Sequence, residues 1–144
     1  MNVNLGAPYE VAIKSIIEKG YAGNRTEVIR QAIMAYKRII EEEELMLVHR
    51  GVMTEMGELE AGKAETHSFE EIKKILEPEV LFLNRLDKMM VVPPRKRMKH
   101  GTPCHVVKVT KQAKIVCEIR GEKIYVLHCF GSHKGYERWY RSYK

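Results

Sequence analysis

The sequence of 144 residues predicts an α+β protein, because helical and strand patterns occupy separate regions of the chain. Apolar residues recur at intervals of three and four through the first forty residues, which is the spacing of helices that bury one side. Beyond residue 103, three short segments rich in β-branched residues are separated by turn residues. This second pattern is typical of an antiparallel sheet.

The first predicted element is a short strand over residues 2–5. Val3 and Leu5 are expected on one side of it and Asn2 and Asn4 on the other, because side chains alternate along a strand. A strand of this length is not stable alone, and the nearby sequence offers no second strand. We therefore expect it to pair with the same strand of a second copy, which gives an antiparallel two-stranded ribbon in a homodimer.

Two helices are predicted next. Pro8 suits the first turn of the first helix, and Gly20 suits its C-terminal end. Asn24 is a good N-cap for the second helix, and Glu27 three residues later completes a pair like a capping box. The apolar stripe of this second helix continues to about residue 48.

The first forty residues resemble the ribbon-helix-helix family of DNA-binding proteins. Four matching segments carry the resemblance: Val3–Leu5, Pro8–Val11, Gly20–Tyr21 and Asn24–Ile33. In that family the ribbon of an intertwined β-α-α homodimer lies in the major groove, and the start of the second helix holds a phosphate. The resemblance therefore implies six DNA-binding positions: Asn2, Asn4, Gly6, Asn24, Arg25 and Thr26.

Within this set, Asn2 and Asn4 are the expected base-contacting residues, because an asparagine amide can pair with adenine through two hydrogen bonds. Gly6 has no side chain, so one usual base contact is missing. The backbone N–H groups of residues 24–26 are the expected phosphate clamp. The implied partners are a short palindromic DNA operator and a second copy of the chain. A dimerisation module without DNA binding is the alternative.

Charge changes sign along the chain. Residues 1–40 carry a net charge of +3, residues 41–79 carry −8 and residues 80–144 carry +11. The basic region is suited to a polyanion, and the acidic region could bind and cover that same surface. Alternatively, the charges are solvated faces of one compact protein. We predict a DNA-binding domain over 1–44, an acidic helical linker over 45–79 and a basic domain over 80–144.

The acidic linker contains a capping box at Ser68–Glu71, which predicts a helix that ends before Pro78. With Gly57 and Glu60–Gly62, this segment resembles the region that follows the DNA-binding part of ParD/RelB-like antitoxins. In that family the region wraps the cognate toxin. The resemblance therefore implies that the acidic linker covers a toxin-like partner.

The basic domain begins with an apolar segment over residues 80–90, which we expect to be a helix, with a strand as the alternative. Pro93–Pro94 ends it. Both faces of the last strand carry apolar residues, which indicates a central strand with Ile124, Val126 and His128 on one face. A short aromatic and basic tail follows. The predicted strands are Cys104–Val109, Ala113–Ile119 and Lys123–Phe130, with a tight turn at Arg120–Glu122.

Residues 100–144 resemble the C-terminal half of the RelE/ParE toxin superfamily, most closely at Ile119–Gly121, Tyr125–Phe130 and Ser132–Lys134. Those toxins have a small antiparallel sheet. Many cut messenger RNA on the ribosome without a metal, whereas ParE members act on gyrase. The resemblance implies an arginine that stabilises charge, a histidine or lysine that moves a proton and a tyrosine that stacks on a base. The candidate catalytic residues are Arg120, His128, His133, Lys134 and Tyr136.

The run before the sheet adds candidate RNA-binding residues, because clustered cations bind phosphates: Arg95, Lys96, Arg97 and Lys99. A solvated loop is the alternative. Only about twenty residues stand where the toxins have a strand and a helical hairpin, so we expect a degenerate domain that no longer cuts RNA. A metal site is a further alternative, but its candidates match no zinc signature and we expect neither metal nor cofactor: Cys104, His105, His128, Cys129 and His133.

Together these patterns predict a sequence-specific transcriptional regulator of antitoxin type, fused to a toxin-like domain that the acidic segment covers. A self-inhibited, ribosome-dependent RNA endonuclease is the first alternative, with RNA or the ribosome as partner. An architectural dimer that binds nucleic acid without sequence preference is the second. We expect a cytoplasmic protein without a membrane partner, because no apolar run approaches about 18 residues, no secretory signal pattern is present and the three cysteines form no CxxC.

Overall fold

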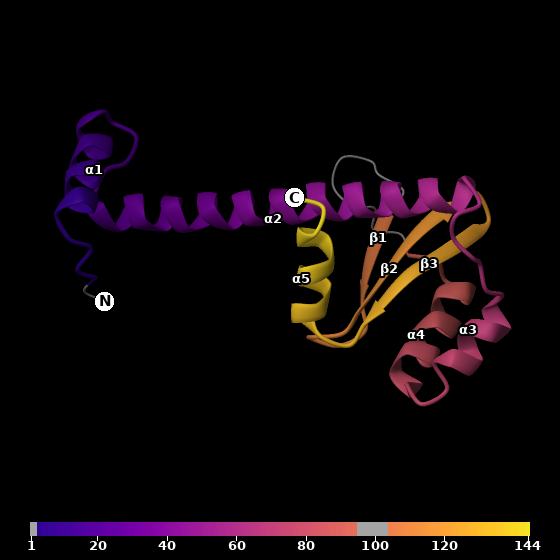
Figure 1. Cartoon of the computed structure of the whole chain (residues 1–144). Helices are drawn as coiled ribbons and strands as arrows, with labels where there is room; N and C mark the ends of the chain where they lie inside the picture. Colours follow the sequence, from indigo (N-terminus) through magenta and orange to yellow (C-terminus); the bar gives the residue numbers. More distant parts are fainter. Residues whose placement is uncertain (1–2, 95–103) are drawn as a thin grey trace. The chain divides into compact units, whose positions relative to one another are not determined.

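The computed structural model describes residues 3–94 and 104–144. The candidate residues Asn2, Arg95, Lys96, Arg97 and Lys99 lie outside the described residues. The described residues confirm the α+β class, and Figure 1 shows the elements in order: α1 (Ala7–Glu18), α2 (Arg25–Glu60), α3 (Phe69–Ile75), α4 (Val80–Val91), β1 (Cys104–Lys108), β2 (Lys114–Arg120), β3 (Lys123–Phe130) and α5 (His133–Arg141).

The chain divides into two compact units, an N-terminal unit up to Glu43 and a C-terminal unit from Glu44 onward. Helix α2 runs through the boundary, so it belongs to both units. The acidic residues 45–79 and the basic residues 80–144 lie in the same compact unit.

Local signals in the sequence set both ends of α1 and the start of α2. Gly6 is the N-cap of α1 with φ of 79°, and Pro8 stands in the first turn, where its missing N–H has no partner to lose. Gly20, also with φ of 79°, follows the C-terminal end. Asn24 caps α2, because its side-chain oxygen accepts a hydrogen bond from the N–H of Glu27 at 2.9 Å.

The N-terminal unit has a small core. Ile13, Ala22 and Val28 are 6–7% exposed, and they are the buried residues around which the unit packs. Residues 3–6 form no regular secondary structure within the single chain. The large apolar side chains of this unit that stay exposed are Tyr9, Val11, Tyr21, Ile33, Met34, Tyr36, Ile39 and Ile40.

Helix α2 is longer than the sequence predicted, since it continues past residue 48 to Glu60. Its second half carries a fully buried stripe: Leu47, Val48, Val52 and Met56, each at most 1% exposed. Gly51 lies where Trp139 of α5 and Tyr143, just after that helix, pack directly against α2. A Cβ built at Gly51 would lie 2.8 Å from the ring of Tyr143 and 3.0 Å from that of Trp139. Close packing therefore explains why a glycine, which weakens a helix locally, is found at this position.

The three strands form one antiparallel sheet in the order β1-β2-β3 (Figure 1), so β2 is the central strand and β3 is an edge. The prediction of a central β3 was wrong. Its two apolar faces have a different cause, because helices cover both sides of the sheet. One face packs on α2 and α5, and the other packs on α3 and α4. A strand at the edge of such a sheet is still apolar on both faces.

A bulge in β3 changes which side chains share a face. Val116 of β2 pairs with His128, whereas the next residue, Cys117, pairs with Val126, so Leu127 is the extra residue. Leu127 packs with the cluster beneath α2 and α5, and His128 bonds to α2 on that same side. The predicted alternation, with His128 on the face of Val126, was therefore wrong at this position.

Helices α3 and α4 confirm their sequence signals. Ser68 and Glu71 form the predicted capping box of α3, and residues 80–91 form a helix rather than a strand. The aromatic tail folds as α5, capped by the side chain of Ser132, which accepts from the N–H of Gly135 at 3.1 Å. None of the described helices has both the length and the apolar character needed to span a membrane.

Candidate functional site

The described residues before α1 that were expected to face DNA bond to one another locally. The side-chain oxygen of Asn4 accepts from the N–H of Gly6 at 3.2 Å, and both residues are exposed. Because φ of Gly6 is 79°, a region that favours glycine, a side chain at this position would be strained. The turn into α1 therefore explains why a glycine stands at this expected base-contacting position.

The start of α2 lies beside the segment that precedes α1. Arg25 forms an ion pair with Glu10 at 2.8 Å and donates to the backbone carbonyl of Val3. The hydrogen bond from Arg25 lowers the pKa of Glu10. The structure thus places the expected clamp next to the expected ribbon, although the Arg25 side chain is already bound within the unit.

A carboxylate also stands at the start of α2. Glu27 Oε2 accepts from the N–H of Gly23 at 2.7 Å, next to the N-cap Asn24 and the exposed Thr26. The positive end of a helix dipole favours an anion at this position, whether a side chain or a phosphate. A DNA phosphate held here would have to share the site with Glu27.

In the C-terminal unit, Arg120 ends β2 between two carboxylates. Its guanidinium pairs with Glu60 of α2, and its Nε donates to Glu118 at 3.2 Å. The hydrogen bonds to Glu60 and then Glu118 raise the pKa of Arg120. Glu118 is 1% exposed, so this arginine compensates one buried negative charge as well as one on the surface.

Glu55 of α2 accepts hydrogen bonds from three aromatic side chains. His128 Nε2 lies 2.8 Å from it, Trp139 Nε1 lies 2.8 Å from it and the Tyr143 hydroxyl lies 3.0 Å from it. Burial by itself would raise the pKa of Glu55, but the hydrogen bonds from His128 and Trp139 and the charge of His128 outweigh it and lower the pKa. The ring of His128 also stacks on Phe130 at 5.1 Å between centroids.

Tyr136 lies in the core, and this corrects its predicted role. The residue is 0% exposed, and its hydroxyl donates to Glu44 at 2.7 Å. Burial, followed by Glu44, raises its pKa. A tyrosine that stacks on an RNA base needs an exposed ring, so base stacking at Tyr136 does not fit the structure.

Sequence reasoning missed Lys114. Its Nζ lies 2.7 Å from His133 Nδ1 and 4.3 Å from the centre of the Tyr136 ring, and the residue is only 8% exposed. Burial lowers the pKa of Lys114. Lysine is almost never buried, and a lysine at the start of a strand carries no local signal of such contacts. Only the approach of α5 to the sheet brings them about.

The five candidate catalytic residues do not form one site. Lys114 and Arg120 stand at opposite ends of β2, about 20 Å apart at the usual rise per residue. His133, bonded to Lys114, and the exposed Lys134 lie at one end, whereas Arg120 lies at the other. What Arg120, His128 and Tyr136 share is a carboxylate partner from α2.

The metal alternative finds no support in the described parts of the chain. No group of three or more His, Cys, Asp or Glu side chains there is arranged to hold a metal ion. Burial raises the pKa of Cys104 to about 11 and that of Cys117 to about 12, so these cysteines are protonated thiols at neutral pH.

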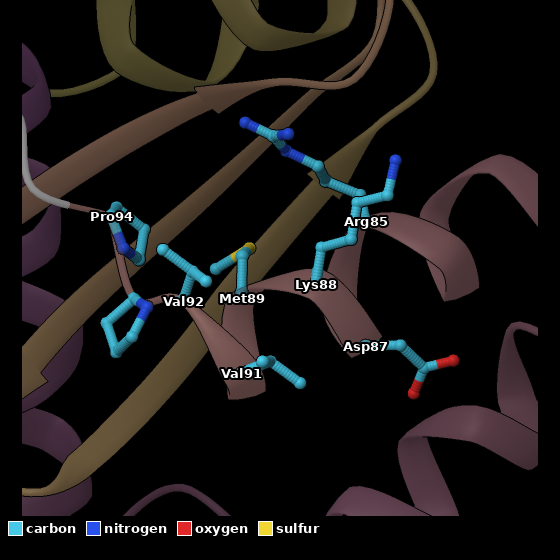
Figure 2. Close-up of a pocket in the computed structure, with 8 residues that line it drawn as sticks. Arg85, Asp87, Lys88, Met89, Val91, Val92 and Pro94 are labelled. Carbon is cyan, nitrogen blue, oxygen red and sulfur yellow. The ribbon is translucent and has the colours of Figure 1, made fainter.

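An open groove of about 660 Å³ lies at the C-terminal end of α4, and none of the predicted site residues within the described parts of the chain lines it. Figure 2 shows Arg85 and Lys88 on one side of the helix and Asp87 on the other. Asp87 forms an ion pair with Lys73 of α3 at 3.0 Å. The rest of the wall is apolar, formed by Met89, Val91, Val92, Pro93 and Pro94.

No protein-family model, curated protein or solved structure matches this chain. Its function is therefore inferred from its own residues and their geometry.

Proposed function

We propose that the protein is a homodimeric, sequence-specific DNA-binding regulator of antitoxin type, whose helix α2 covers candidate catalytic side chains of the same chain. One observation carries the proposal. Two glutamates of α2 each accept a hydrogen bond from a candidate catalytic residue, in the pairs Glu55–His128 and Glu60–Arg120. The same helix begins at the expected phosphate clamp. A single element thus joins the DNA-binding and covering parts.

The exposed surface of the N-terminal unit supports the homodimer. Ile33, Tyr36 and Ile40 recur at helical spacing on α2 and are 60, 66 and 40% exposed. A unit of about forty residues rarely buries enough apolar surface to be stable alone. A second copy would cover these side chains and would also give residues 3–5 the strand partner that they lack in a single chain.

The electrostatics of the C-terminal unit support the covering role. A phosphate that approaches Arg120 competes with Glu60 for the same guanidinium, because both are anions that bind through charged hydrogen bonds. His128 is one-third exposed, but its Nε2 is engaged by Glu55. An α2 carboxylate therefore already binds each of these two basic groups, and a polyanion would have to displace it.

The packing of α2 supports a permanent cover rather than a removable one. Leu47, Val52 and Met56 form the core together with Val116 and Tyr136. Withdrawal of this helix would expose that core to water, at a cost of about 25 cal/mol for each Å² of apolar surface. We therefore propose that the toxin-like part is normally inactive.

A self-inhibited RNA endonuclease is the second candidate, and the arrangement around His128 favours it. A carboxylate that holds one ring nitrogen of a histidine fixes the orientation of the ring, as a general base requires. In this alternative, Glu55 positions His128, and only the Glu60–Arg120 pair holds the site closed.

The DNA-binding proposal is tested by titrating the full chain with its own upstream DNA and with random DNA at two salt concentrations. We expect a preference for the upstream fragment that survives the higher salt. Asn4→Ala should reduce that preference by about tenfold, since one base contact is worth about 1–3 kcal/mol. Asn84→Ala, at an exposed asparagine of α4, is the matched control. Equal and salt-sensitive binding to both fragments would instead indicate an architectural dimer.

The covering proposal is tested by Glu60→Gln in the full chain, with Glu58→Gln on the same helix as the control. A degenerate domain leaves growth and cellular RNA unchanged when either variant is expressed. Growth arrest with RNA cleavage for Glu60→Gln alone, lost again in Glu60→Gln with Arg120→Ala, would establish the endonuclease and overturn the inactive cover.

A further inference from the structure

The contact between Lys114 and His133 has no role in the function proposed above. Lys114 opens β2, where it pairs with Lys108 of β1 and Phe130 of β3, and it is 92% buried. A buried ammonium group needs partners to offset the loss of water. Lys114 has the ring of Tyr136 at 4.3 Å and His133 Nδ1 at 2.7 Å.

The chemistry of this contact fixes the state of the histidine. An ammonium group can only donate, so the Nδ1 atom that it contacts at 2.7 Å must accept and carry no proton. With Nδ1 as the acceptor, the ring hydrogen of His133 lies on Nε2. His133 is an exposed residue, and the charge of Lys114 polarises this Nε2–H group as a donor.

Charges of both signs surround the pair. Glu44 of α2 favours the charged form of Lys114, the nearby Lys108 disfavours it less strongly, and Lys134 is exposed next to His133. The side-chain oxygen of Gln112 accepts from the N–H of His133 at 3.4 Å, which ties the β1–β2 turn, with its Lys111, to the start of α5. The facing carboxylate is Glu44 of α2, which accepts the Tyr136 hydroxyl.

We infer that Lys114, His133 and Lys134 form a binding site for a phosphate group, with His133 Nε2–H as the central donor and Lys134 as the exposed cation. The backbone N–H groups at the start of α5 are not the phosphate donors in this site. The N–H groups of His133 and Gly135 are used by Gln112 and Ser132. In this site, phosphate oxygens accept hydrogen bonds from His133 Nε2–H and from the Lys134 ammonium. The buried Lys114 ammonium strengthens the hydrogen bond from His133. The inference depends on the C-terminal unit alone and stands apart from DNA binding.

The test follows the His133 ring in the full chain by nuclear magnetic resonance. In the free protein, the ring nitrogens should show the tautomer with hydrogen on Nε2. Inorganic phosphate should shift the His133 signals in a saturable way. Lys114→Met should remove both the fixed tautomer and about ninety per cent of the affinity, a tenfold loss typical of one charge-assisted hydrogen bond. Lys114→Gln should keep the tautomer, because an amide N–H can still donate to Nδ1, but should weaken phosphate binding.

Two controls keep the result interpretable. Lys123→Met removes an exposed lysine at the opposite end of the sheet, where it pairs with Arg120, and should leave phosphate binding unchanged. His133→Asn changes an exposed position and so provides a folded variant if Lys114→Met does not fold. It should also weaken phosphate binding about tenfold.

A short single-stranded RNA then separates the two sources of phosphate. RNA that displaces the phosphate-induced shift of His133 identifies the phosphodiester of a nucleic acid as the ligand. RNA that leaves this shift unchanged identifies small phosphates as the ligands. Signals of His133 that move with neither ligand, or an affinity unchanged in both Lys114→Met and His133→Asn, would overturn the inference.

Discussion

The two compact units use the same helix in opposite ways. In the N-terminal unit, Ile33 and Tyr36 of α2 are 60 and 66% exposed, whereas Leu47 and Val52 on the same helix in the C-terminal unit are 1 and 0% exposed. Both halves carry an apolar stripe, and the difference lies in what packs against it. The C-terminal unit supplies its own sheet and α5, whereas the N-terminal unit supplies α1, Leu5 before it and Ala22 after it.

This contrast shows that an apolar stripe predicts a helix but does not identify its partner. The C-terminal unit has cores on both faces of its sheet, and the N-terminal unit has one small cluster with large apolar side chains outside it. We therefore propose that a second copy completes the N-terminal unit. For the C-terminal unit we propose that one chain is enough, provided that it retains residues 44–60 of α2.

The largest expected effect comes from removing all residues before α4 (Val80–Val91). Residues 80–144 alone should fail to fold, because they lose the four buried α2 side chains of the core, whereas residues 44–144 should melt cooperatively. Thermal unfolding followed by circular dichroism measures both. A cooperative transition for residues 80–144 would show that α2 is dispensable. For the same reason, toxicity of the sheet region has to be assayed in the full chain.

The buried half of α2 is tested by Leu47→Ala. We expect a loss of about 2–5 kcal/mol in the free energy of unfolding, as for other large-to-small substitutions in a core. Met46→Ala is the matched control. Met46, the residue next to Leu47, is 53% exposed, so its substitution should change the free energy of unfolding by less than about 0.5 kcal/mol. Denaturant unfolding of the full chain gives both values. Equal losses would contradict the assigned burial.

The exposed half of α2 is tested by Ile33→Gln. If a second copy covers this side chain, the substitution should weaken the dimer by about 1.5–3 kcal/mol for each buried isoleucine. Sedimentation equilibrium measures the dissociation constant, and Met46→Gln on the same helix is the control. If the chain is monomeric both with and without the substitution, the proposed difference between the two units is wrong, because both units would then be stable by themselves.

A smaller effect is expected at Glu55, the acceptor for three aromatic side chains. Its pKa is lower in the folded chain than the ordinary value of 4.5, so its contribution to stability is full above about pH 4.5 and is lost as the pH falls through the lower folded value. Glu55→Gln should cost about 2 kcal/mol at neutral pH. Urea unfolding of both proteins between pH 3 and 7 checks this.

Two outcomes at Glu55 have different meanings. A stability difference that shrinks toward zero at the acid end of the series supports the assigned role of the carboxylate. A difference that stays constant across the series would show that the substitution acts through packing rather than through charge. Glu58→Gln, also on α2, is the control for the loss of one negative charge.

The sequence alone determined the elements whose signals are local. Ser68 and Glu71 cap a short helix by bonding to the backbone beside them, and the alternation of β-branched residues marks the three strands. Gly20 and Asn24 likewise place the break between the first two helices. These signals act within a few residues of themselves, so they need no knowledge of the rest of the chain.

Tertiary structure decided the candidate sites. Whether Tyr136 faces a ligand or the core depends on α2, which lies more than seventy residues away in sequence. The bulge that turns His128 toward Glu55 is set by strand register, and the bond between Lys114 and His133 exists only because α5 returns to the sheet. The physical reason is that burial and pKa depend on neighbours brought together by folding, whereas helix caps and strand alternation depend on neighbours along the chain.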